Sequence, residues 1–178
     1  MWSQSGVRGI HTALLFSVCG AASSQLLNLQ DWGIYLLPIP FGILAAWLCV
    51  DGVLPGITLV ILSEGVWQAA YRVAERLGAE SGTGRKVFAM CLAGLIGGLG
   101  MALATAAAKR LSPPPAALGI IAVAGTIGAL PFAAWLVSGN EAVLPEWAQM
   151  LLSFAIWQGG VGFGLWWSFG GGRRGTAP

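Results

Sequence analysis

The sequence predicts an all-α fold, a polytopic membrane bundle of six transmembrane helices, and two observations carry this prediction. First, 56% of the 178 residues are hydrophobic and only 9% are charged, with a mean hydropathy of +0.75. An average soluble domain carries about 25% charged residues. Nine Lys and Arg with seven Asp and Glu are too few to cover a water-exposed surface of this size. The composition therefore argues against a soluble enzyme, a nucleic-acid binder and a disordered chain.

Second, nearly all charges lie between apolar stretches of about 20 residues, the length that crosses a hydrocarbon core about 30 Å thick. The first predicted span is 9–27, and we expect it to be retained rather than cleaved as a signal peptide. The second is 32–50, which Pro38 and Pro40 should kink. The third runs from 53 to about 71 and contains polar side chains, so the alternative is five spans with this one in the interface.

A polar connection, 72–86, separates the first three spans from the last three. The fourth span is 87–108, closed by two basic residues and a triple proline. The fifth is 116–137, and an acidic loop, 138–146, follows it. The sixth is 147–169. Helices of this kind need no strand and no second domain, so residues 1–178 are expected to form one integral membrane domain.

An internal repeat is suggested by short identical stretches. Val-Leu-Pro precedes Trp-Gln by the same spacing in both halves, at 53–55 with 67–68 and at 143–145 with 157–158. Ala-Ala-Trp-Leu lies upstream of both, at 45–48 and 133–136. This pairs the second span with the fifth and the third with the sixth, giving half-repeats of about 8–78 and 86–170.

Each half then holds an odd number of spans, so the second half is inverted relative to the first. Inverted repeats are common in secondary transporters, whose sites lie near the bilayer midplane. With both termini inside the cell, five basic residues face the cytoplasm and four face the outside. This difference gives the orientation little support from the positive-inside rule.

Glu64 is the sharpest candidate for function, because it lies near the middle of the third span. A charge there costs about 2.5 to 3.5 kcal/mol on insertion scales. Gln68 follows one turn later on the same helical face. We interpret Glu64 as a proton-coupling or cation-binding carboxylate, with Gln68 and the repeat-related Gln158 as polar lining. The alternative is a protonated Glu64 that bonds to a neighbouring helix.

Trp67 and Trp157 occupy matching positions of the repeat and lie inside their spans. Most other Trp residues of the chain fall near span ends, where aromatic belts form. The two inner indoles are therefore candidates for flanking a central site, although core packing is the simpler role.

Small residues recur every four positions on the fourth and sixth spans. Such stripes let helices approach closely, within one bundle or between copies of the chain. We expect these positions to pack helices; they are Gly94, Gly98 and Ala102 with Ala106, and Gly160 with Gly164.

Signals for enzymes, metals and cofactors fail on inspection. His11 is the only histidine, and the three cysteines lie far apart without ligand spacing. The glycine-rich stretch 82–86 lacks the spacing of a phosphate-binding loop. The net charge of +2 is too small for a nucleic-acid surface. We therefore expect no catalytic residue, no metal and no cofactor.

Together these features predict a multi-pass protein of the cell inner (plasma) membrane that moves a small solute or ion. The alternative function is that of a non-catalytic accessory or assembly subunit of a larger membrane complex. In that case the small-residue stripes are docking surfaces for other subunits. The expected partners are the lipid bilayer and either further copies of the chain or other membrane subunits.

Overall fold

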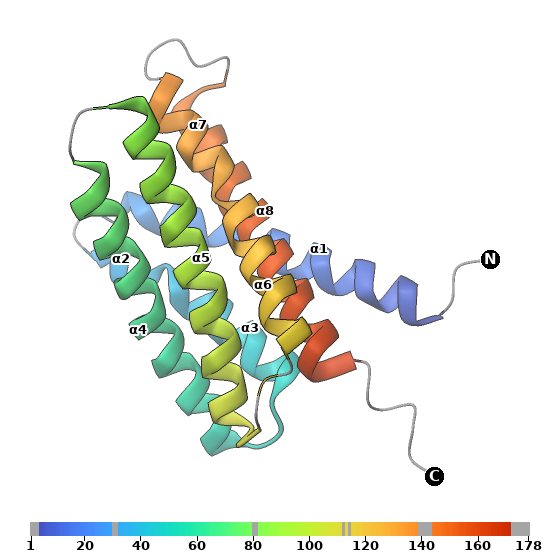
Figure 1. Ribbon diagram of the computed structural model, residues 1–178. Helices are drawn as coiled ribbons and strands as arrows, with labels where there is room; N and C mark the ends of the chain where they lie inside the picture. The colour runs from blue at the N-terminus through green and yellow to red at the C-terminus, as the bar shows by residue number, and fades with distance from the viewer. Residues whose placement is uncertain are drawn as a thin grey trace.

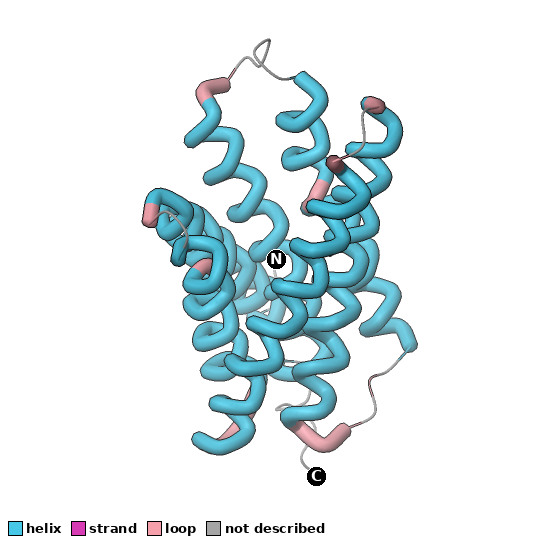
Figure 2. The backbone as a smooth tube through the Cα atoms, turned by 90° about the vertical axis from the view of Figure 1, so that its left-hand side faces the viewer, coloured by secondary structure: helices cyan, strands magenta, loops and turns pink. Residues whose placement is uncertain are grey.

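The computed structural model describes residues 4–29, 32–79, 82–111, 113, 115–138 and 144–171. Within these ranges every regular element is helical and no strand occurs, which confirms the all-α prediction (Figure 2). The elements are α1 (Gln4–Ser24), η1 (Gln25–Asn28), α2 (Gly33–Leu36), α3 (Pro38–Cys49), α4 (Val53–Gly78), α5 (Thr83–Ala108), α6 (Pro115–Gly128), α7 (Leu130–Ser138), α8 (Glu146–Leu165) and η4 (Trp166–Gly171).

Four described segments are long and apolar enough to cross a membrane: Arg8–Asn28, Val53–Gly78, Thr83–Ala108 and Pro115–Ser138. A shorter apolar helical segment covers Gly33–Cys49. The 20-residue α8 is not one of these four segments. These helices are those of a membrane protein.

The long helices pack side by side, whereas α1 runs obliquely across them (Figure 1). Helices α4 and α5 form an antiparallel hairpin, α6 returns beside α5, and α8 packs against α6. Helix α1 crosses α8 and makes one of the most extensive contacts of the described chain with it. The two helices lie so close at this crossing that a Cβ at Gly20 of α1 would overlap the carbonyl of Phe154 of α8.

Two apolar segments are broken where proline interrupts the helix. Within the second predicted span, α2 ends at Leu36 and α3 begins at Pro38, which agrees with the expected kink. Residues 115–138 are likewise divided between α6 and α7 at Ala129, two residues before Pro131. Proline lacks an amide hydrogen and clashes with the carbonyl four residues earlier, so each break leaves a carbonyl without its helical donor.

The predicted polar connection 72–86 is wrong in its extent. Helix α4 continues to Gly78 and α5 begins at Thr83, so most of these residues are helical. Arg, Glu and Lys have high helix propensity, and helices can extend beyond the hydrocarbon core without cost to their charged side chains. The loop between the two helices is therefore short.

The small residues of α5 lie against α6. A Cβ at Gly94 would overlap the carbonyl oxygen of Gly125, and a Cβ at Gly98 would lie 2.6 Å from the carbonyl oxygen of Ile121. Ala102, one turn further along, is fully buried. The two backbones meet at these positions because neither helix presents a large side chain there.

The glycines of α8 contact the same helix. A Cβ at Gly164 would lie 2.8 Å from Cγ1 of Ile121, and one at Gly160 would lie 3.5 Å from Cβ of Ala124. Helix α6 therefore packs against the small-residue stripes of both α5 and α8, within a single chain.

Candidate functional site

A cavity of about 400 Å³ lies between α2, α3, α4, α5, α7 and α8. Its lining is almost entirely aliphatic and aromatic. Along α4 the lining extends from Ser63 to Gly78, which corresponds to about 22 Å of helix. The cavity is therefore long and narrow, with two distinct ends.

The inner end of the cavity is buried in the middle of the bundle. Phe41 of α3, Met101 of α5 and Gln158 of α8 line it, and each is at most 2% exposed. The outer end lies at the C-terminus of α4 and the N-terminus of α5, where the lining includes Glu75 and Gly78. The lining of the cavity thus reaches the polar surface at the end of the bundle where α4 ends and α5 begins.

Aromatic rings surround the inner half. The rings of Phe41 and Trp157 are 5.7 Å apart, and those of Trp67 and Phe154 are 5.8 Å apart. Phe132 of α7 meets Phe154 edge to face at 4.9 Å. Contacts of this kind fix ring positions beyond what area burial alone provides. The two Trp residues that the predicted repeat pairs, 67 on α4 and 157 on α8, therefore line one cavity.

Trp157 is seated on glycines of two other helices. A Cβ at Gly97 of α5 would lie 2.7 Å from the indole Cζ2, and a Cβ at Gly128 of α6 would lie 2.7 Å from the Cα of Trp157. A larger side chain at either position would push this indole out of the wall. The small residues of α5 therefore shape the cavity as well as the helix packing.

Trp67 is positioned by the proline break between α2 and α3. Its Nε1 donates a hydrogen bond of 2.8 Å to the carbonyl of Ile34. That carbonyl is four residues before Pro38, so it lacks the helical donor that any other residue at 38 would supply. The pair thus satisfies a partly buried acceptor and joins α4 to α2.

Gln158 is the most polar group at the inner end. Its side chain is 1% exposed, and its Oε1 has no hydrogen-bond partner in the described part of the chain. Buried amides are normally paired, because an unpaired one costs about 1–3 kcal/mol. The unpaired oxygen marks the inner end as a place where a ligand group can bind.

Glu64 and Gln68 do not line the cavity. Gln68 Nε2 donates a hydrogen bond of 2.8 Å to Glu64 Oε1, as their spacing on α4 allows. Glu64 Oε2 is buried without a hydrogen-bond partner among the described residues. The structure therefore separates the sequence candidates: Trp67, Trp157 and Gln158 line one cavity, while Glu64 and Gln68 pair with each other on α4 outside that lining.

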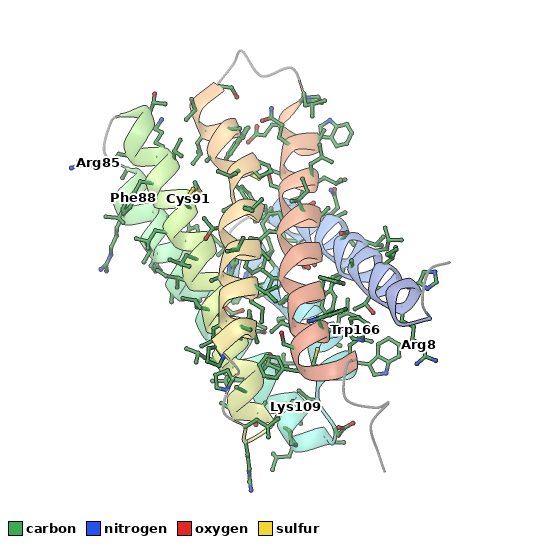
Figure 3. The ribbon with its side chains drawn as sticks, turned by 45° about the vertical axis from the view of Figure 1, so that its right-hand side comes forward. Arg8, Arg85, Phe88, Cys91, Lys109 and Trp166 are labelled. Atoms are coloured by element: carbon green, nitrogen blue, oxygen red, sulfur yellow. The ribbon has the colours of Figure 1, made fainter. Side chains whose placement is uncertain are left out.

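Charged side chains gather at the outer end. Arg72 and Glu75 form an exposed ion pair at 2.9 Å on α4. Arg85 projects from the start of α5 at the same end of the bundle, and Lys109 lies at the opposite end of that helix (Figure 3). The outer opening of the cavity is therefore bordered by water-facing residues.

The opposite end of the bundle is tied together by Lys109. Its Nζ donates 2.8 Å hydrogen bonds to the carbonyls of Cys49, the last residue of α3, and Phe169 in η4. Carbonyls at helix ends lack intrahelical donors, and a cation there also complements the helix dipole. Sequence reasoning placed Lys109 only at the end of a span, because its two partners lie 60 residues away in either direction.

The sequence did not reveal the lining residues of α5 and α7, such as Met90, Ala93 and Leu136. They are ordinary apolar residues of membrane helices, and only the packing of six elements makes them neighbours. In the described ranges no group of three or more His, Cys, Asp or Glu side chains could hold a metal ion. His11 is exposed on α1.

Comparison of the chain with protein-family models, with curated proteins and with solved structures found no match.

Proposed function

We propose that the protein binds a small, mainly apolar molecule in this cavity and moves it across the cell inner membrane. The observation that carries the proposal is the long apolar cavity that opens at one end and stops in the middle of the bundle at Gln158. Binding sites for small molecules are typically apolar cavities of about 300–1,000 Å³ with a few polar groups. An inner end near the bundle centre is also where secondary transporters place their substrates.

An apolar molecule fits this cavity better than an inorganic ion does. A desolvated cation requires several oxygen ligands around it. Among the described lining residues, the inner half offers only the Gln158 amide and the Ser63 hydroxyl, which donates to the carbonyl of Val60 at 2.7 Å. The proposal therefore narrows the expected solute to an organic molecule, and Glu64 is left as a coupling group rather than a ligand.

The architecture that we propose for the protein has six spans in two inverted halves. Helices α2 and α3 together, and α8 alone, supply the two spans beyond the four segments that are long and apolar enough to cross a membrane. The 20 residues of α8 extend about 30 Å, the thickness of the hydrocarbon core. Its polar residues Ser153 and Gln158 are buried inside the bundle, so they add no polar surface toward lipid.

The helix contacts support the inverted repeat. The repeat equates α1 with α5, α3 with α7 at the Ala-Ala-Trp-Leu match, and α4 with α8. Under this exchange the contact of α1 with α8 becomes that of α5 with α4, and these are the two most extensive contacts of the described chain. The contact of α3 with α4 likewise corresponds to that of the α6–α7 segment with α8. Val143 of the second motif lies outside the described residues.

A photoreactive alkane tests the binding site directly. The protein in lipid nanodiscs is irradiated with dodecane that carries a central diazirine, and labelled residues are mapped by mass spectrometry. We expect labels on cavity-lining residues of α4 and α5. Ala93→Trp, which fills the cavity, should remove these labels.

Ala107→Trp is the matched control, because it adds the same ring at an exposed position of the same helix. It should leave the labels in the cavity unchanged. Labels confined to lipid-facing residues, or equal labelling of the lining in both variants, would contradict the proposal.

A further inference from the structure

The polarity of the cavity changes along its length. The described ionisable side chains of its lining, Tyr71 and Glu75, belong to α4 beyond Ala70, toward the outer end. Between the two ends the lining is supplied by Ala70, Ala93 and Gly97, which offer no hydrogen-bonding side chain. Gln158 then supplies an amide at the inner end, with an unpaired oxygen.

The inner end disfavours a charged ligand group. No cationic or anionic side chain of the described residues lines it. Lys109, the cation at the opposite end of the bundle, is bound to two carbonyl oxygens and is not part of the lining. An ion moved into such surroundings would lose its hydration without a partner, which costs far more than burying a neutral polar group.

A neutral hydroxyl suits the Gln158 amide. A hydroxyl both donates and accepts, so it can donate to Oε1 and accept from the amide hydrogens. The terminal torsion of Gln is broad and roughly two-fold, so the amide can turn either of its ends toward the cavity. A ligand without such a group would fill the apolar channel but leave the Gln158 oxygen unpaired.

We propose that the ligand is an uncharged, elongated molecule with a long apolar chain and one terminal hydroxyl-type group, which binds hydroxyl-inward at Gln158. This rests on the proposed function of the cavity and adds the chemical class of the ligand. Gln158 determines specificity by bonding the hydroxyl. The aromatic rings around it exclude water, and the apolar channel holds the chain. A hydroxyl left at the outer opening would instead stay in contact with water, so hydrogen bonds to the protein there would only replace bonds to water and add little to binding.

Two isomeric competitors test this assignment. The protein in nanodiscs is labelled with dodecanol that carries a central diazirine, and unlabelled 1-dodecanol or 1-methoxyundecane is added as a competitor. The two have the same formula and nearly the same length, but only the alcohol can donate a hydrogen bond. Concentrations are measured within the bilayer, so that unequal partitioning into lipid does not enter the comparison.

In the wild-type protein, 1-dodecanol should displace the label from the cavity at about one-tenth of the ether concentration, since it pairs the buried amide oxygen. In Gln158→Leu the label should still reach the lining, but the advantage of the alcohol should disappear. Gln149→Leu is the control on the same helix: Gln149 lies outside the cavity lining, and the tenfold advantage should persist.

Equal competition by alcohol and ether in the wild-type protein would overturn the hydroxyl assignment, even if Gln158→Leu failed to fold. An advantage that survives in Gln158→Leu would overturn the role of Gln158. In both cases cavity labelling remains, and the proposed binding function stands. If neither photoreactive dodecane nor photoreactive dodecanol labels the lining, the binding function and this inference both fail.

Discussion

At the residue scale, the candidate site depends on a few side chains whose partners come from other helices. Trp67 takes over an acceptor that Pro38 leaves unpaired, Trp157 rests on two glycines, and Gln158 keeps an unpaired oxygen beside an apolar channel. The identities of these residues were visible in the sequence. Their common cavity was not, because a Gln or Trp in a membrane helix has the same local pattern whether it faces a cavity, another helix or lipid.

Trp67→Phe should destabilise the protein by about 1 kcal/mol, because the partly buried carbonyl of Ile34 loses its donor while ring packing is largely kept. Thermal unfolding in detergent, followed by tryptophan fluorescence, measures the change. Trp47→Phe is the control, since Trp47 is 74% exposed. Equal shifts in both variants would show that the hydrogen bond to Ile34 contributes nothing.

Glu64→Gln tests the coupling role predicted from the sequence. Glu64 does not line the cavity, so the variant should bind the photoreactive dodecane as the wild-type protein does. Proton uptake into proteoliposomes, followed with an enclosed pH-sensitive dye, should lose its dependence on added dodecanol, because an amide cannot carry the proton. A variant that folds and keeps this dependence would rule out Glu64 as the coupling group.

At the element scale, close helix crossings and proline breaks define the bundle. The periodicity of small residues on α5 and α8 was readable from the sequence, but their shared partner α6 was not. The break between α2 and α3 was expected from Pro38, whereas the break between α6 and α7 was not. Local pattern indicates that a helix face can approach another closely, while the fold determines which helix occupies it.

Substitution of glycine by alanine should have opposite effects on stability at two positions of the α5–α6 pair. Gly94→Ala places a Cβ against the carbonyl of Gly125 and should destabilise the protein by about 1–3 kcal/mol. Gly119→Ala on α6 has nothing within 4 Å and should stabilise it by about 0.5–1 kcal/mol, as in an ordinary helix. Unfolding midpoints of both variants check the signs, and a stabilising Gly94→Ala would contradict the observed crossing.

Lys109→Met should loosen the end of the bundle opposite the cavity opening. The change removes two charge-assisted hydrogen bonds to helix-end carbonyls, and we expect a loss of about 1.5–3 kcal/mol. Hydrogen exchange of the amides near Cys49 and Phe169 should increase most. Lys86→Met, at the other end of α5, is the control and should leave these amides protected.

At the scale of the whole molecule, the lining of the cavity extends from the middle of the bundle toward one end, and movement across the membrane requires a second state that opens toward the other. The proposed inverted halves would supply a physical basis for two such states, since exchanging the conformations of the halves would turn the opening around. Gly82, exposed beside α5, marks the side on which the observed cavity opens.

Cysteine accessibility tests for the second state. In a background without natural cysteines, Ser63→Cys at the inner end should react slowly with a membrane-impermeant maleimide added from either side of proteoliposomes. Gly82→Cys should react from one side only and fixes the sidedness. Reaction of Ser63→Cys from the Gly82 side alone would show a binding protein that does not expose its cavity to both sides.

The sequence by itself determined that the surroundings of the protein are lipid, that its fold is helical, and which residues lipid cannot easily accommodate. It did so because a hydrocarbon core imposes length, apolarity and internal hydrogen bonding on each segment separately. Only the tertiary structure decided that Gln158 and the two Trp residues line one cavity and that Glu64 lies outside its lining. The sequence pattern of each helix is the same in either arrangement, because the two arrangements differ in how each helix is rotated against neighbours distant in the sequence.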